Sequence, residues 1–212
     1  MNQIEALQRL RSLGTPVVET RDVAALLQTS TSAATTILRR LTQKKMITHL
    51  SRGRWLVDEK LDRLALPELI SAPYPAYVSM QSALFQHGLI EQIPAVIYAV
   101  TPARPRRLAT PLGTISFHRM PPELFNGFEL STRSTAKVAT PEKALFDLFY
   151  LAPGRSRLFS NLPELTIPRR FRWERLKEFT KLVKSPGRQT YITGRIRALR
   201  ARRASPEPGH FT

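Results

Sequence analysis

Hydroxyl and cationic side chains that could bind a polyanion are concentrated between residues 31 and 54 of this chain. No Asp or Glu occurs from Ala24 to Val57, so no carboxylate in this stretch would repel phosphate groups. Short hydroxyl side chains can hydrogen bond to the edges of bases, while Arg and Lys bind phosphates. These residue types predict a surface for double-stranded DNA. Its candidate residues are Thr31, Ser32, Thr35, Thr36, Arg39, Arg40, Lys44, Arg52 and Arg54.

Two helices separated by a short turn are predicted to position these side chains. Thr20 is a candidate N-cap of the first helix and Ser30 of the second. Each helix has one apolar stripe with helical spacing. The stripes consist of Val23, Leu26 and Leu27 in the first helix and of Ala34, Ile37, Leu38 and Leu41 in the second. Gln28 in the turn stands where many such turns have Gly, which adopts left-handed backbone angles more easily.

A two-stranded hairpin is expected to follow, with strands at residues 46–50 and 54–57. Gly53 allows a positive φ in the turn between them, and the flanking arginines could contact phosphates or the minor groove. Helix, turn, helix and hairpin together predict a winged helix-turn-helix, whose second helix enters the major groove. The alternatives are a small helical domain with a solvated basic face and a winged helix that binds protein.

Positive charge dominates the composition, because the sequence contains 33 Lys and Arg but only 16 Asp and Glu, which gives a net charge of +17. The excess is greatest in residues 169–203, which contain 13 Lys or Arg and 2 Asp or Glu. Such a segment is expected to attract polyanions, or alternatively an acidic partner protein. A last helix is expected over residues 191–203. It would carry an auxiliary basic surface of Arg195, Arg197, Arg200, Arg202 and Arg203.

The pattern as a whole predicts an α+β protein with two domains. Residues 1–66 form the winged helix-turn-helix domain, and residues 67–204 form a mixed α/β domain that ends in basic helices. Residues 205–212 are expected to be a disordered tail. The chain has no Cys and no run of about 18 apolar residues, so we expect a cytoplasmic protein without a membrane span.

Catalytic patterns are scarce in the sequence. There is no P-loop and no metal-binding histidine pair, and four histidines are scattered along the chain. Glu142 and Asp147 are five residues apart on one predicted helix, so they do not share a face well. We therefore expect no enzyme, no cofactor and no metal site.

Four segments of the second domain occur in an order that resembles a known family. They are S-x-x-S-A-L-x-x-H-G-L from Ser79, the strand at residues 94–101, G-T-I-x-F-H-R from Gly113, and V-A-T-P-E-K-A-L-F-D from Val138. With the N-terminal winged helix, this order resembles the AbiEi family of antitoxins. These are the antitoxins of bacterial type IV toxin–antitoxin systems, paired with a nucleotidyltransferase toxin.

The resemblance implies two functions in one chain. The winged helix would bind inverted repeats in its own promoter, cooperatively, and repress the operon. The second domain would counter the nucleotidyltransferase toxin, with direct contact between the two left open. No zipper-like heptads are present, so we expect a monomer in solution. The alternatives are a stand-alone winged-helix regulator and a DNA- or RNA-processing enzyme that the winged helix targets.

Overall fold

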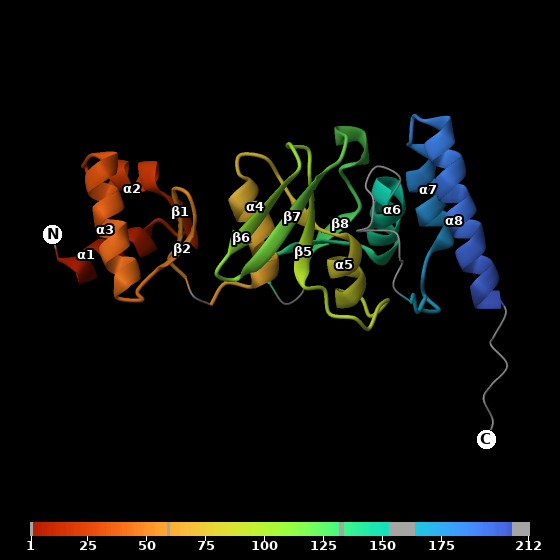
Figure 1. The fold of residues 1–212 in the computed structure, drawn as a ribbon, viewed down its shortest axis with the longest axis horizontal. Coiled ribbons are helices and arrows are strands. Elements are labelled where there is room, and N and C mark those ends of the chain that lie inside the picture. The colour runs from red at the N-terminus through yellow and green to blue at the C-terminus, as the bar shows by residue number, and fades with distance from the viewer. Residues whose placement is uncertain (1, 59, 132–133, 153–163, 205–212) are drawn as a thin grey trace, which may run out of the picture.

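The computed structural model describes residues 2–58, 60–131, 134–152 and 164–204, with side chains up to residue 201. The predicted tail, residues 205–212, lies outside these ranges. The fold is α+β, as expected, with one small and one larger sheet. Figure 1 shows an elongated molecule, with the first helices at one end of its longest axis and the last two helices at the other. Among the described helices, none combines the length and apolar character needed to cross a bilayer.

The N-terminal unit combines three helices with a three-stranded antiparallel sheet of order β1-β3-β2. Its elements are α1 (Gln3–Ser12), β1 (Val17–Glu19), α2 (Thr20–Leu26), α3 (Thr31–Gln43), β2 (Thr48–Ser51) and β3 (Arg54–Leu56). Ser30 caps α3 as predicted, because its hydroxyl accepts a hydrogen bond from the Ala33 amide at 3.2 Å. Fully buried Leu10, Val23 and Leu41 form part of the core beneath α3.

Two local details of this unit differ from the expectation. Thr20 does not cap α2 but is its first residue; its hydroxyl accepts a hydrogen bond from the Trp55 ring nitrogen at 2.9 Å. The partner lies 35 residues away, so a local pattern could not indicate it. Gln28 adopts a left-handed φ of 49° in the turn between α2 and α3, so this turn forms without Gly.

The larger sheet belongs to the second unit and is mixed, with the order β6-β7-β5-β4-β9-β8. Its strands are β4 (Tyr77–Val78), β5 (Val96–Thr101), β6 (Arg106–Thr110), β7 (Gly113–Arg119), β8 (Phe128–Leu130) and β9 (Lys137–Ala139). Strands β6 and β7 form an antiparallel hairpin, and the strand expected at residues 94–101 is β5. Strand β5 runs parallel to β7, and β4 runs parallel to β9.

Helix α6 (Pro141–Leu151) is the most buried helix of this unit, with every side chain from Glu142 to Tyr150 buried. Thr140 caps it, because its hydroxyl accepts a hydrogen bond from the Lys143 amide. It packs against α5, α7 and α8. The other helices are η1 (Arg63–Ala65), α4 (Leu66–Ser71), α5 (Met80–Gln86), η2 (Pro122–Leu124), α7 (Trp173–Lys181) and α8 (Pro186–Ala204).

Helix α8 begins five residues earlier than the predicted start at Tyr191. The Ser185-Pro186-Gly187 segment does not interrupt the helix. Instead, the Ser185 hydroxyl accepts a hydrogen bond from the Arg188 amide at 3.4 Å. Proline fits the first helical position because its nitrogen needs no hydrogen-bond partner there. The segment is therefore the start of α8.

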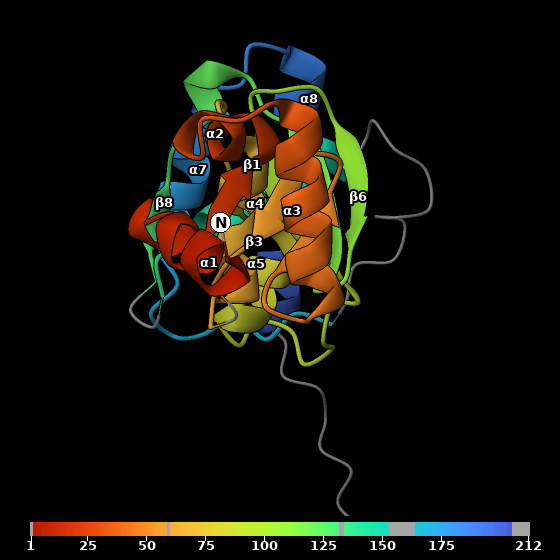
Figure 2. The ribbon, with the colours of Figure 1, turned by 90° about the vertical axis from the view of Figure 1, so that its left-hand side faces the viewer.

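The β2–β3 hairpin packs against both units. Trp55 and Val57 belong to the small core, whereas Leu50 and Leu56 belong to the core of the second unit. Successive residues of a strand point to opposite faces, so β3 can contribute to two cores at once. Figure 2 shows the molecule from the N-terminal end, with α3 in front and β6 of the larger sheet to its right and farther from the viewer.

Candidate nucleic-acid interface

A groove of about 800 Å³ lies between α3 and the β2–β3 hairpin. Three of the predicted DNA-binding residues line it: Thr35 and Arg39 from α3, and Arg52 from the turn of the hairpin. The structure thus brings together side chains separated by up to 17 positions in the sequence. The remaining lining residues are Thr20, Thr42, Gln43, His49, Gly53 and Trp55.

Trp55 gives this groove a fixed floor. Its indole is buried, and its ring nitrogen donates to the Thr20 hydroxyl. The exposed ring of His49 lies 4.4 Å from the Trp55 ring, centroid to centroid. His49 was not among the site residues predicted from the sequence. His49 lies opposite Trp55 in the β2–β3 register. The expected hairpin with strands at residues 46–50 and 54–57 already pairs these two positions, and this pairing could have indicated His49.

The hydroxyl groups at the start of α3 are oriented by the helix itself. Thr35 donates its hydroxyl proton to the Thr31 carbonyl at 2.7 Å, and Thr36 donates to the Ser32 carbonyl at 3.1 Å. Their oxygens therefore face any ligand mainly as acceptors. An acceptor can bind the exocyclic amino group of cytosine or adenine, and the threonine methyl can contact the thymine methyl.

The cations of this surface are exposed and available to a ligand. Among the residues that the structure describes, no carboxylate forms an ion pair with Arg39, Arg40, Lys44 or Arg52. An unpaired, solvated cation can bind a phosphate without first breaking an internal contact. Four predicted cations therefore remain candidates for phosphate binding.

Arg54 is placed differently from the expectation. Its guanidinium contacts Glu19 at 3.1 Å and donates to the Ala72 carbonyl at 3.2 Å, and its side chain is only 23 % exposed. Glu19 lies directly opposite Arg54 in the β1–β3 register. Both contacts use the Nη2 group, so this group links the two units, and a phosphate contact through the other N–H groups of Arg54 stays a prediction.

No protein-family model matches this chain, and no curated protein matches it. The resemblance to AbiEi antitoxins therefore rests on the ordered motifs alone. The structure assigns several motif residues to buried contacts.

The motif residues Ser79, Lys143 and Asp147 meet in one buried cluster with Tyr77. Asp147 accepts hydrogen bonds from the Ser79 hydroxyl at 2.7 Å and the Tyr77 hydroxyl at 3.0 Å. The Lys143 ammonium contacts Asp147 at 2.6 Å and donates to the Leu124 carbonyl at 2.7 Å. Burial raises the pKa of the Asp147 carboxyl, while Lys143 and the two hydroxyl groups oppose that rise.

This cluster holds the second unit together. The side chains of Lys143 and Asp147 are 0 % exposed, so a substrate cannot reach them in this conformation. Ser79 occupies the N-cap position of α5, but its hydroxyl donates to Asp147 and makes no cap hydrogen bond. The signal in the sequence was a Lys and an Asp four residues apart within an otherwise apolar helix.

Other motif residues also connect elements. A ring nitrogen of His87 lies 2.8 Å from the Ala139 carbonyl and links the end of α5 to β9. Glu142 accepts a hydrogen bond from the Arg172 amide at 2.8 Å, where α7 begins. Among the described residues, no group of three or more His, Cys, Asp or Glu side chains is arranged to hold a metal ion.

Some arginines of the predicted auxiliary surface pack against aromatic rings and hold α8 against the second unit. Arg195 lies over the Phe149 ring at 5.8 Å, and Arg200 lies over the Trp173 ring at 5.5 Å. Arg197 is exposed, and the side chains of Arg202 and Arg203 lie outside the described residues. Figure 1 places α8 and α3 at opposite ends of the molecule, so this basic surface is not adjacent to the α3 groove.

Proposed function

We propose that this protein is a DNA-binding repressor whose N-terminal unit is a winged helix-turn-helix. In this proposal α3 is the recognition helix, and the β2–β3 hairpin is the wing. Thr31, Ser32, Thr35 and Thr36 face base edges in the major groove. Arg39, Arg40, Lys44 and Arg52 bind phosphates beside it.

The α3 groove is the single observation that carries this proposal. It places the Thr35 acceptor, the Arg39 guanidinium and the Arg52 guanidinium around one concave surface. Protein–DNA interfaces combine phosphate contacts, which position the protein, with base contacts, which specify the sequence. Both kinds of group are present here, with no carboxylate between Ala24 and Val57 to repel the backbone.

We further propose that the repressor is the antitoxin of a bacterial type IV toxin–antitoxin pair and acts in the cytoplasm. The AbiEi resemblance of the second unit supports this half of the proposal. The chain would bind inverted repeats upstream of its own gene, as monomers that associate cooperatively on DNA. Its second unit would counter a nucleotidyltransferase toxin. A stand-alone regulator with the same DNA-binding unit is the competing function.

A mobility-shift titration with the DNA upstream of the gene of this protein tests the proposed repressor function. A scrambled duplex of equal length and composition is the matched control, and both are titrated across a range of salt concentrations. The expected result is preferential binding to the upstream DNA that persists as salt increases. Equal and strongly salt-sensitive binding to both duplexes would contradict sequence recognition.

The antitoxin part of the proposal is tested by co-expressing the chain with the gene that lies beside the gene of this protein. If that neighbour encodes a nucleotidyltransferase that arrests growth, the wild-type chain should restore growth. The Arg39→Ala/Arg52→Ala variant should also restore growth, because neutralisation is assigned to the second unit. A toxic neighbour that the wild-type chain fails to neutralise would leave a repressor without an antitoxin function.

A further inference from the structure

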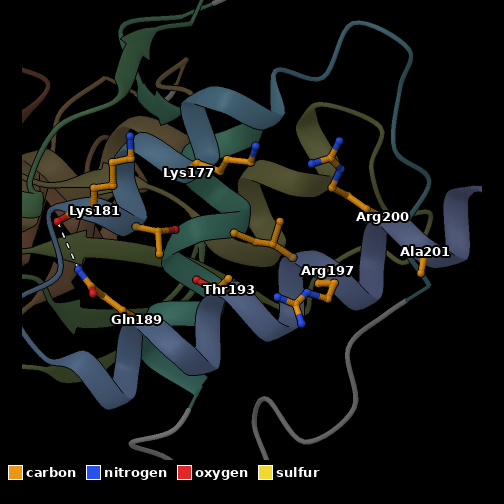
Figure 3. Close-up of a pocket in the computed structure, with 9 residues that line it drawn as sticks. Lys177, Lys181, Gln189, Thr193, Arg197, Arg200 and Ala201 are labelled. Carbon is orange, nitrogen blue, oxygen red and sulfur yellow. Dashed lines mark hydrogen bonds between the residues drawn. The ribbon is translucent and has the colours of Figure 1, made fainter.

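A second groove lies between α7 and α8, at the end of the molecule farthest from α3. Its volume is about 800 Å³. Lys177 and Lys181 line it from α7, and Arg197 and Arg200 line it from α8. Figure 3 shows these cations distributed along both helices, with Lys181 near one end of the groove and Arg200 near the other.

Between the cations the groove has an apolar floor. Ile196 and Ala201 line it, together with Thr180 and Thr193. The Thr180 hydroxyl donates to the carbonyl of Leu176 at 2.9 Å, so its proton is already used within α7. The groove therefore combines cationic walls with a surface on which a flat, weakly polar group can pack.

Two carboxylates of α7 moderate the positive charge. Glu174 lies 2.8 Å from the Lys177 ammonium, and its pKa is lowered mainly by that hydrogen bond and further by Arg200 and Lys181. Glu178 is the second and is exposed. The four cations that line the groove outnumber these carboxylates, and the positive charge extends beyond the groove. Exposed Arg169, Arg170 and Arg172 precede α7. A ligand with several negative charges in a row fits this distribution better than one with a single charge.

We propose that the α7–α8 groove binds single-stranded nucleic acid, with phosphates on the cationic walls and bases on the apolar floor. A duplex holds its bases stacked inside, so it cannot use the floor. A single strand can turn its bases towards a protein surface while its backbone follows a positively charged groove. The arginines outside the groove favour a strand over a free nucleotide. This site is independent of the proposed repressor function, because it lies at the opposite end of the molecule.

Fluorescence anisotropy of the full chain with a short labelled single strand of mixed sequence tests the inference. The Lys181→Ala/Arg197→Ala variant should bind about tenfold more weakly, and its salt slope should fall by about 1.4, at about 0.7 per phosphate contact. Both side chains are exposed, so the variant should melt like the wild type. Glu174→Gln should strengthen binding two- to threefold, roughly, because it frees Lys177.

The matched control removes two cations from the other end of the protein. Arg39→Ala/Arg52→Ala should change single-strand affinity less than about twofold. Equal losses in the two double variants would overturn the proposal, because binding would then reflect overall charge. The repressor proposal would be unaffected, since it depends on duplex binding by the control surface.

Three competitors test the assignment to a single strand. An abasic strand of equal length should compete about threefold less well, because it lacks the bases that would contact Ile196 and Ala201. A free nucleotide should compete more weakly than the strand. Equal competition by the abasic strand or by the matching duplex would overturn the proposal and leave a phosphate-binding patch. More effective competition by an acidic peptide would overturn it in favour of a protein partner.

Discussion

The two basic ends of this molecule use their cations differently. At the α3 end, Arg39 and Arg52 are exposed beside a groove, and no described carboxylate forms an ion pair with them. At the α8 end, Arg188 lies over the Tyr150 ring at 4.6 Å, and Arg195 and Arg200 lie over other aromatic rings. The α8 end has the larger excess of Lys and Arg, and several of its arginines pack against aromatic rings.

This difference shows that the number of cations in a segment does not measure its capacity to bind a polyanion. A guanidinium over an aromatic ring contributes to stability through both its charge and its methylene groups. An exposed cation contributes little to stability and remains available to a ligand. The buried Lys143 is the extreme case of structural use.

The largest expected effect comes from removing the partner of that buried cation. Asp147→Ala should lower the free energy of unfolding by about 3–5 kcal/mol, because Lys143 would remain buried without its counter-charge. Urea denaturation followed by tryptophan fluorescence measures this loss. Glu174→Gln breaks an exposed pair as a control and should leave the urea denaturation curve unchanged. Equal effects of the two substitutions would contradict the distinction between buried and exposed cations.

Next in size is the loss of duplex binding at the α3 end. Arg39→Ala/Arg52→Ala should weaken binding to the upstream DNA about 100-fold and reduce the salt slope by about 1.8, at about 0.9 per phosphate contact. The unfolding free energy should stay within about 0.5 kcal/mol of wild type. A mobility-shift titration measures the affinity. Lys181→Ala/Arg197→Ala is the control, and if it weakened duplex binding as much, the two ends would not differ as described.

A smaller effect is expected from a stacked arginine of α8. Arg188→Gln should lower the free energy of unfolding by about 0.5–1 kcal/mol, because it removes the cation over the Tyr150 ring. It should leave binding to the upstream DNA unchanged. Thermal denaturation compared with that of Arg197→Gln, an exposed residue of the same helix, measures the difference. If Arg188→Gln caused no loss of stability, or if Arg197→Gln caused an equal loss, the stabilising role assigned to Arg188 would be contradicted.

The smallest effect concerns specificity. Thr35→Val keeps the methyl group but removes the acceptor oxygen, so it should lower the preference for the upstream DNA over the scrambled duplex about twofold. Affinity for the scrambled duplex should change little, because phosphate contacts are retained. Parallel titrations of both duplexes measure this ratio. Equal weakening on both would place Thr35 outside base recognition.

Local signals in the sequence predicted many elements of the fold. The Ser30 cap and the Gly53 turn both depend on neighbouring residues, and both are present. The hydrogen bond from Ser79 to Asp147 joins residues 68 positions apart, so no local signal could indicate it. The larger sheet could not be ordered in advance, since its parallel pairs join distant strands.

The candidate DNA-binding site shows the same limit. Residue types indicated Thr35, Arg39 and Arg52, which the structure places around one groove. They could not indicate that Arg54 is paired, because Glu19 becomes its neighbour only when β1 aligns with β3. Whether an arginine is free to bind a ligand thus depends on which residues the strand register places beside it.

The β2–β3 hairpin has a consequence for how the protein unfolds. Because β3 directs Trp55 into one core and Leu56 into the other, neither core can be lost without exposing apolar surface of the other. Arg54 adds a hydrogen bond across the same junction. Melting should therefore be one cooperative transition and not two independent ones. A fragment of residues 1–66 would lose the partners of Leu50 and Leu56, so the first unit depends on the second for its solubility as well as its stability.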